Sequence, residues 1–263
     1  MNRKTYPFYL LSAFFLGILG ALFRGKQLVS AFDSETGILL RGEPETIALL
    51  ICFAFSFVGA VAFALLTKKD CDVSTSPRND RFIRASFFIS AVIVLFFAFL
   101  KFIELQNGFM VTTLILALLS VYCSVSLFAL GKYGMRERDS AGYCVFAVVP
   151  VFWACYLLVL LFRDKIPDPI LADYVFAVFA YIFVLLIAYG ISANVLGKCA
   201  SRLTVFSCFL GMSVMMTELF SRLASNLFFG GAFEFTVESF AEWLPILAFL
   251  LLIPAVSGKI SKR

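Results

Sequence analysis

Histidine is missing from all 263 residues of this chain. Its absence removes the commonest general base near neutral pH and the commonest side-chain ligand of transition metals. A haem or quinone site held by histidine is therefore excluded. Cysteine occurs seven times but never as C-x-x-C, so the cysteines indicate small buried apolar residues, not a disulfide framework or a zinc site.

Familiar catalytic motifs are also missing. The chain contains no G-x-x-x-x-G-K-[ST] loop and no G-x-S-x-G elbow. The paired aspartates of intramembrane proteases do not occur either. We therefore expect no catalytic residue, no cofactor, no metal ion and no nucleic-acid partner.

Charge is scarce, and this scarcity defines the class of protein. Only 15% of the residues are charged and 62% are hydrophobic, whereas a soluble domain has about 25% and about 45–50% respectively. Such an excess of apolar surface must face lipid. The sequence predicts an all-α integral membrane protein forming a single polytopic domain over residues 1–263.

Eight stretches have the roughly 20 apolar residues that a helix needs to cross a bilayer. They cover residues 7–23, 46–66, 85–103, 109–130, 143–162, 170–191, 203–229 and 233–256. In order along the chain they pair as four helical hairpins. Asp168 and Pro169 suit the start of the sixth helix, and Gly230 and Gly231 suit the end of the seventh.

The distribution of basic residues predicts the orientation. Fifteen of the 22 lysines and arginines fall in segments 1–6, 67–84, 131–142, 192–202 and 257–263. Cytoplasmic loops carry such an excess, so both termini are expected in the cytoplasm. Twelve of the 17 acids fall on the other side. Depletion of basic residues by insertion explains this imbalance; an outer surface that attracts cations is the alternative.

The middles of the spans carry no charge, and the second, fourth and fifth contain none at all. Proton-coupled pumps and voltage sensors place ionisable groups at that depth. A proton relay through the centre is therefore not expected. Facilitated transport along a polar, uncharged path remains compatible with the sequence.

The charges that do lie on helices gather towards the outer end, where they form a candidate binding vestibule. Its members are Lys101, Glu104, Arg163, Asp164, Asp173, Glu218, Arg222 and Glu242. Glu218 and Arg222 are one helical turn apart. They have two interpretations. One is a hydrated ion pair at the membrane–water interface, worth a few tenths of a kcal/mol. The other is a pair in which Glu218 faces the vestibule.

Two neighbouring features also have alternative interpretations. Glu234, Glu238 and Glu242 are spaced four apart, so they either offset the dipole of the last helix or line an entrance for a cation. The connection at residues 24–45 either covers the vestibule or is a solvated linker.

The function expected from the sequence is binding or transport of a small solute or lipid through this outward-facing vestibule. The alternative is a membrane sensor, accessory or assembly subunit that docks another membrane protein. Membrane lipids are expected partners in both cases. The absence of N-x-S/T sequons is compatible with a bacterial cytoplasmic membrane.

Overall fold

The fold is all-helical in a computed structural model that describes residues 6–32, 39–40, 42–67, 80–108, 110–133, 141–165, 174–196, 200–231 and 236–260. The helices in these ranges are α1 (Tyr6–Ser30), α2 (Pro44–Leu66), α3 (Asp80–Asn107), α4 (Val111–Tyr133), α5 (Ala141–Lys165), α6 (Val175–Val195), α7 (Ser201–Phe228) and α8 (Val237–Ile260). Extended pairing within the same ranges is limited to one antiparallel bridge between Phe32 and Leu39.

Each of the eight helices is long and apolar enough to span a membrane, as the sequence predicts. The shortest, α6, has 21 residues, which at about 1.5 Å per residue exceeds the roughly 30 Å of a bilayer core. A helix is favoured there because it satisfies its own backbone hydrogen bonds where water is absent.

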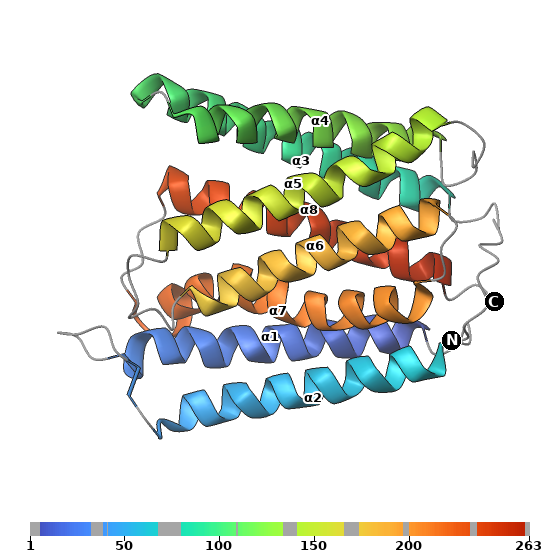
Figure 1. Cartoon of the computed structure of the whole chain (residues 1–263). Coiled ribbons are helices and arrows are strands. Elements are labelled where there is room, and N and C mark those ends of the chain that lie inside the picture. The colour runs from blue at the N-terminus through green and yellow to red at the C-terminus, as the bar shows by residue number, and fades with distance from the viewer. Residues whose placement is uncertain are drawn as a thin grey trace.

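The helices form a bundle with α2 at one edge and the α3–α4 pair at the other (Figure 1). Between them, α7 contacts α1, α2, α6 and α8. It is the most buried of the spans, and α2 is the least buried. The first residues of α1 and the last of α8 lie at the same end of the bundle (Figure 1).

The most extensive helix pair is α1 with α7, and the two run parallel. Tyr9 Oη donates to the Val205 carbonyl over 2.9 Å, and Ser213 Oγ donates to the Ala13 carbonyl over 3.2 Å. Gly25 approaches Ser221 further along both helices. Serine and threonine hydroxyls often bond between membrane helices in this way.

Several helix ends differ from the predicted spans. The first helix ends at Ser30 instead of residue 23, so it contains Arg24. The third covers Asp80–Asn107 instead of 85–103. The seventh ends at Phe228, where Gly230 has a φ of 70° and the Gly231 N–H donates to the Ser225 carbonyl. Asp168 and Pro169 lie outside the described residues.

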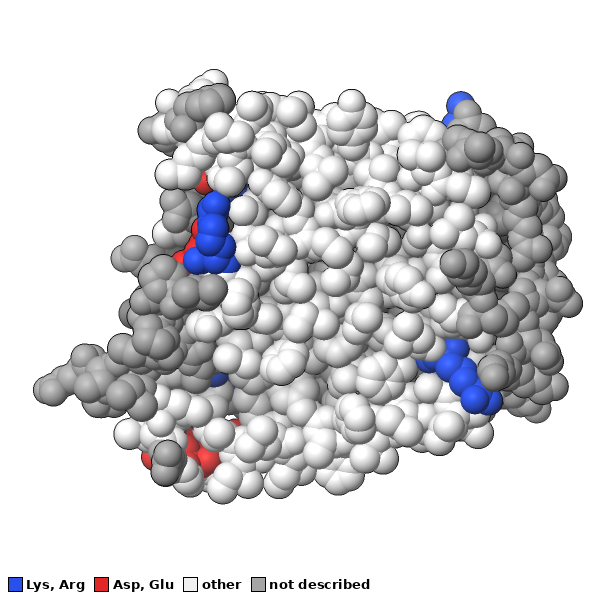
Figure 2. Space-filling model, viewed as in Figure 1, with Lys and Arg blue, Asp and Glu red and all other residues white. Residues whose placement is uncertain are grey.

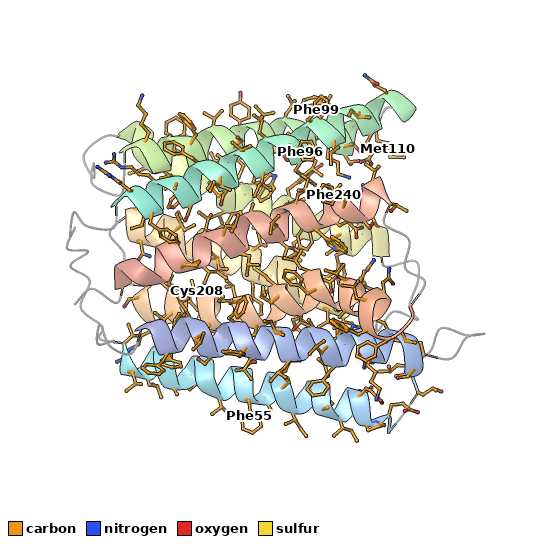
Figure 3. The ribbon with its side chains drawn as sticks, turned by 180° about the vertical axis from the view of Figure 1, so that it is seen from behind. Phe55, Phe96, Phe99, Met110, Cys208 and Phe240 are labelled. Carbon is orange, nitrogen blue, oxygen red and sulfur yellow. The ribbon has the colours of Figure 1, made fainter. Side chains whose placement is uncertain are left out.

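The sides of the bundle are apolar. On the face shown in Figure 2, charged atoms gather near the two ends and leave an uncharged band between them. Phe55 projects outward from α2 and is 65% exposed (Figure 3). Exposed apolar surface this extensive exceeds what soluble monomers carry. The band therefore faces lipid in a multi-pass membrane protein.

Candidate functional site

Four of the predicted site residues form two salt bridges near helix ends. On α3, Lys101 Nζ lies 2.6 Å from Glu104 Oε2, and the Glu104 side chain is 49% exposed. At the end of α5, Arg163 Nη2 lies 2.8 Å from Asp164 Oδ1. Exposed pairs of this kind are worth about 0–1 kcal/mol. The principal contacts of α3 are with α4 and α8, and those of α5 are with α4 and α6, whereas Glu218 lies on α7.

Glu218 is buried, with only 4% of its surface exposed. The Glu218 side chain is therefore enclosed within the bundle. The predicted partner in the same helix, Arg222, is partly exposed. A carboxylate enclosed within the bundle is costly unless its surroundings compensate its charge, so the residues around Glu218 define the site.

Arg24 directly follows the predicted first span, residues 7–23, and lies inside the bundle. It is 1% exposed and lies six residues before the end of α1. Its guanidinium lies 4.5 Å from the ring centre of Phe176 on α6 and 5.6 Å from that of Phe32. Aromatic faces attract a desolvated guanidinium more strongly than a hydrated one. Phe32, two residues after the end of α1, therefore contacts the buried guanidinium.

A hydrogen-bond chain links Arg24 to α2. Arg24 Nη1 donates to Gln27 Oε1 over 2.6 Å, and Gln27 Nε2 donates to Thr46 Oγ1 over 2.8 Å. Next to Thr46, Glu45 Oε1 lies 2.7 Å from Lys26 Nζ. These hydrogen bonds and the ion pair therefore join the end of α1 to the first turn of α2. Two of the side chains involved, Gln27 and Glu45, are buried.

Tyr181 brings α6, α7 and α8 together at the same site. Its hydroxyl donates to the backbone carbonyl of Glu242 over 2.8 Å. Glu242 and Glu218 both lie within electrostatic range of the Tyr181 phenol. Two of the predicted site residues, Glu218 and Glu242, are thus near a common tyrosine that the sequence did not single out.

The parallel register of α1 and α7 places Arg24 close to the level of Glu218. Gly20 packs against Thr217, and Gly25 packs against Ser221 and Ala224. Arg24 therefore lies within about one helical turn of Glu218 along the bundle axis. We call this group the interhelical polar cluster; its members are Arg24, Gln27, Glu45, Thr46, Tyr181, Glu218 and Glu242.

A repeating spacing in α1 could have indicated the burial of Arg24. Ala13, Gly17, Ala21, Arg24 and Gln27 follow one another at intervals of four or three residues, and all of them are buried. Residues at these intervals share one helix face. Since the first three are small, that face is the one that packs closely against another helix.

Other predicted features lie outside the part of the chain that can be described. Asp173 and Glu234 are outside the described residues, and so is the side chain of Glu238. Among the described residues, no group of three cysteine or acidic side chains could hold a metal ion. Cys52, Cys123, Cys144, Cys155 and Cys208 are free thiols.

The cluster combines a guanidinium, carboxylates, a phenol and an amide drawn from five helices. Such groups can bind a polar or charged ligand by charge-assisted hydrogen bonds, which are stronger where water is excluded. Comparison of the chain with protein-family models, curated proteins and solved structures found no match.

Proposed function

We propose that the chain binds or moves a small solute or lipid at the interhelical polar cluster. The observation that carries this proposal is the burial of Arg24 and Glu218 between helices. Ionisable residues within membrane spans are costly and commonly mark ligand or ion pathways. The sides of the bundle contact lipid, so a ligand could reach the cluster from water or from the bilayer.

A purely structural role explains the cluster less well. Replacing a buried ion network by apolar side chains of similar volume is often neutral or stabilising. In this protein α1 and α7 already pack through Gly17 and Gly25 without any charge. The polar groups of Arg24, Tyr181 and Glu218 are therefore more than the packing of these helices requires.

The proposed topology is four hairpins with both termini in the cytoplasm of a bacterial cell. Two features support it: the excess of basic residues in the predicted inner segments, and the common end shared by the start of α1 and the end of α8 (Figure 1). The cluster then lies towards the outer side, where α1 is connected to α2.

Single-cysteine labelling tests this orientation. Ser30 and Arg81 are both exposed and are expected on opposite sides of the membrane. In a variant with its natural cysteines replaced, a membrane-impermeant maleimide should label Ser30→Cys in intact cells and Arg81→Cys only after the membrane is opened. The reverse pattern, or labelling of both in intact cells, would contradict the proposed topology.

Binding itself is tested with the full-length protein in phosphatidylcholine nanodiscs. Thermal unfolding is measured against a panel of amino acids, sugars, organic acids and amines, and native mass spectrometry detects retained lipids. A ligand of the folded state raises the unfolding temperature. We expect Glu218→Gln to abolish the effect of any ligand that the wild type binds, and Arg222→Gln to reduce it.

Arg81→Gln is the control, because Arg81 is exposed near the opposite end of the bundle. The double variant Glu218→Gln/Arg222→Gln should behave like the single Glu218 variant. Ligand effects that are unchanged in a folded Glu218→Gln protein would overturn the proposal and favour the accessory-subunit alternative.

A further inference from the structure

One carboxylate oxygen of the interhelical polar cluster has no hydrogen-bond partner within the part of the chain that the structure describes. Glu45 is the second residue of α2, and its side chain is only 9% exposed. Glu45 Oε1 lies 2.7 Å from Lys26 Nζ. Among the described residues, Glu45 Oε2 is the one enclosed side-chain oxygen or nitrogen without a hydrogen-bond partner.

The unpartnered oxygen is relevant because a carboxylate accepts hydrogen bonds at both oxygens. A buried acceptor without a hydrogen bond is unfavourable, and in native structures nearly all buried acceptors have a hydrogen-bond partner. The polar side chains beside Glu45 already bond to each other, since Gln27 connects Arg24 to Thr46. Neither of these hydrogen bonds reaches Glu45 Oε2, so this oxygen can accept a hydrogen bond from a ligand.

Lys26 indicates what kind of donor fits. Its side chain is 51% exposed while it pairs with Glu45. A lysine with a flexible stem can withdraw its ammonium into water at little cost. Glu45 would then be an enclosed carboxylate without the cation that pairs with its Oε1 atom. The position beside it suits another primary ammonium.

We propose that Glu45 recognises the primary ammonium group of a ligand. The ligand's N–H donates to Glu45 Oε2, and its positive charge takes over from Lys26. This inference rests on the proposed function, because it names the chemistry of one end of the ligand. A free amine and the headgroup of an aminophospholipid both carry this group, and Ile47 and Leu50 on the exposed face of α2 provide apolar surface for acyl chains.

The test compares ethanolamine with choline, using the full-length protein in phosphatidylcholine nanodiscs. The two cations have the same charge, but the quaternary ammonium of choline has no N–H to donate. We expect ethanolamine to raise the unfolding temperature and choline to have no effect. Glu45→Gln should weaken ethanolamine binding by about tenfold or more, the effect of losing a charge-assisted hydrogen bond.

Glu43→Gln is the matched control, because Glu43 lies two residues away and is only partly buried. It makes the same change of charge and should leave ethanolamine binding unchanged. Lys26→Met tests the exchange of ammonium groups in the opposite direction. It removes the competing cation, so ethanolamine should bind more tightly than it does to the wild type.

The source of the ammonium is tested in nanodiscs that contain phosphatidylethanolamine. Selective retention of phosphatidylethanolamine over phosphatidylcholine in native mass spectrometry, lost in Glu45→Gln, identifies a lipid ligand. An ethanolamine effect without such retention identifies a free amine. Both results support recognition of an ammonium by Glu45. If neither occurs in the wild type, the inference is wrong.

Three results separate this inference from the proposed function. Equal ethanolamine binding by wild type and Glu45→Gln overturns the role of Glu45 alone. If Glu45→Gln does not fold, unchanged or weaker binding in Lys26→Met overturns it instead. A ligand from the wider panel that depends on Glu218 but not on Glu45 leaves the proposed function standing.

Discussion

An Arg24→Met variant is expected to lose about 3–5 kcal/mol of unfolding free energy, the usual cost of removing one member of a buried charged network. Methionine fills much of the same space but carries no charge. The change leaves Gln27 Oε1 without the donor that now lies 2.6 Å away. It also removes a cation from the level at which the Glu218 carboxylate is buried.

Unfolding of this variant can be followed by tryptophan fluorescence during denaturant titration in mixed micelles. Trp153 is a suitable probe because it is buried and stacks with Phe249 at 5.9 Å between ring centres. Arg81→Met is the control, and we expect it to change stability by less than about 0.5 kcal/mol because Arg81 is exposed.

A double variant separates charge from packing. In Arg24→Met/Glu218→Met both buried charges are absent. We expect a large part of the lost stability to return, because apolar replacements of whole buried ion networks are often tolerated. Strictly additive losses in the double variant, or a loss below about 1 kcal/mol in Arg24→Met, would contradict electrostatic coupling of the two residues.

The second large effect is expected from Gly25→Ala, which should lower the unfolding free energy by about 1–3 kcal/mol. In a helix that faces open space the same change stabilises by roughly 0.5–1 kcal/mol. Here the new Cβ would lie 2.8 Å from the Ser221 carbonyl oxygen and 3.0 Å from the Ser225 nitrogen. Both are backbone atoms, so α1 and α7 must move apart.

Gly108→Ala serves as the comparison, because a Cβ at Gly108 would meet nothing within 4 Å. Both variants are measured by the same denaturant titration. The predicted close contact of α1 and α7 at Gly25 would be falsified if Gly25→Ala were as stable as the wild type or more stable. A loss confined to Gly25 would show that the α1–α7 contact depends on its glycine.

The helices and the exposed pairs could be predicted from local sequence. Runs of apolar residues require a helix in lipid wherever they occur, so all eight were found without knowledge of their neighbours. Lys101 and Glu104 are three residues apart on one helix and bond to each other. Such features depend on intervals within one element, and the sequence contains that information directly.

The burial of Arg24 was missed because an arginine after an apolar run usually marks the lipid boundary. The helix in fact continues to Ser30, and no proline interrupts residues 24–30. Whether a side chain at that level meets water or protein depends on what packs against it. For Arg24 this is Phe176, which lies 152 positions further along the chain.

The sequence alone determined that this protein is a bundle of eight apolar helices, because hydrophobic length and the scarcity of charge are properties of each segment separately. Only the tertiary structure decided which charged residues are enclosed. Glu218 is buried because α7 contacts helices on several sides. Glu45 is enclosed beside the end of α1, and its Oε2 atom has no hydrogen-bond partner among the described residues. Contacts between distant segments set these environments, and no interval along the chain encodes them.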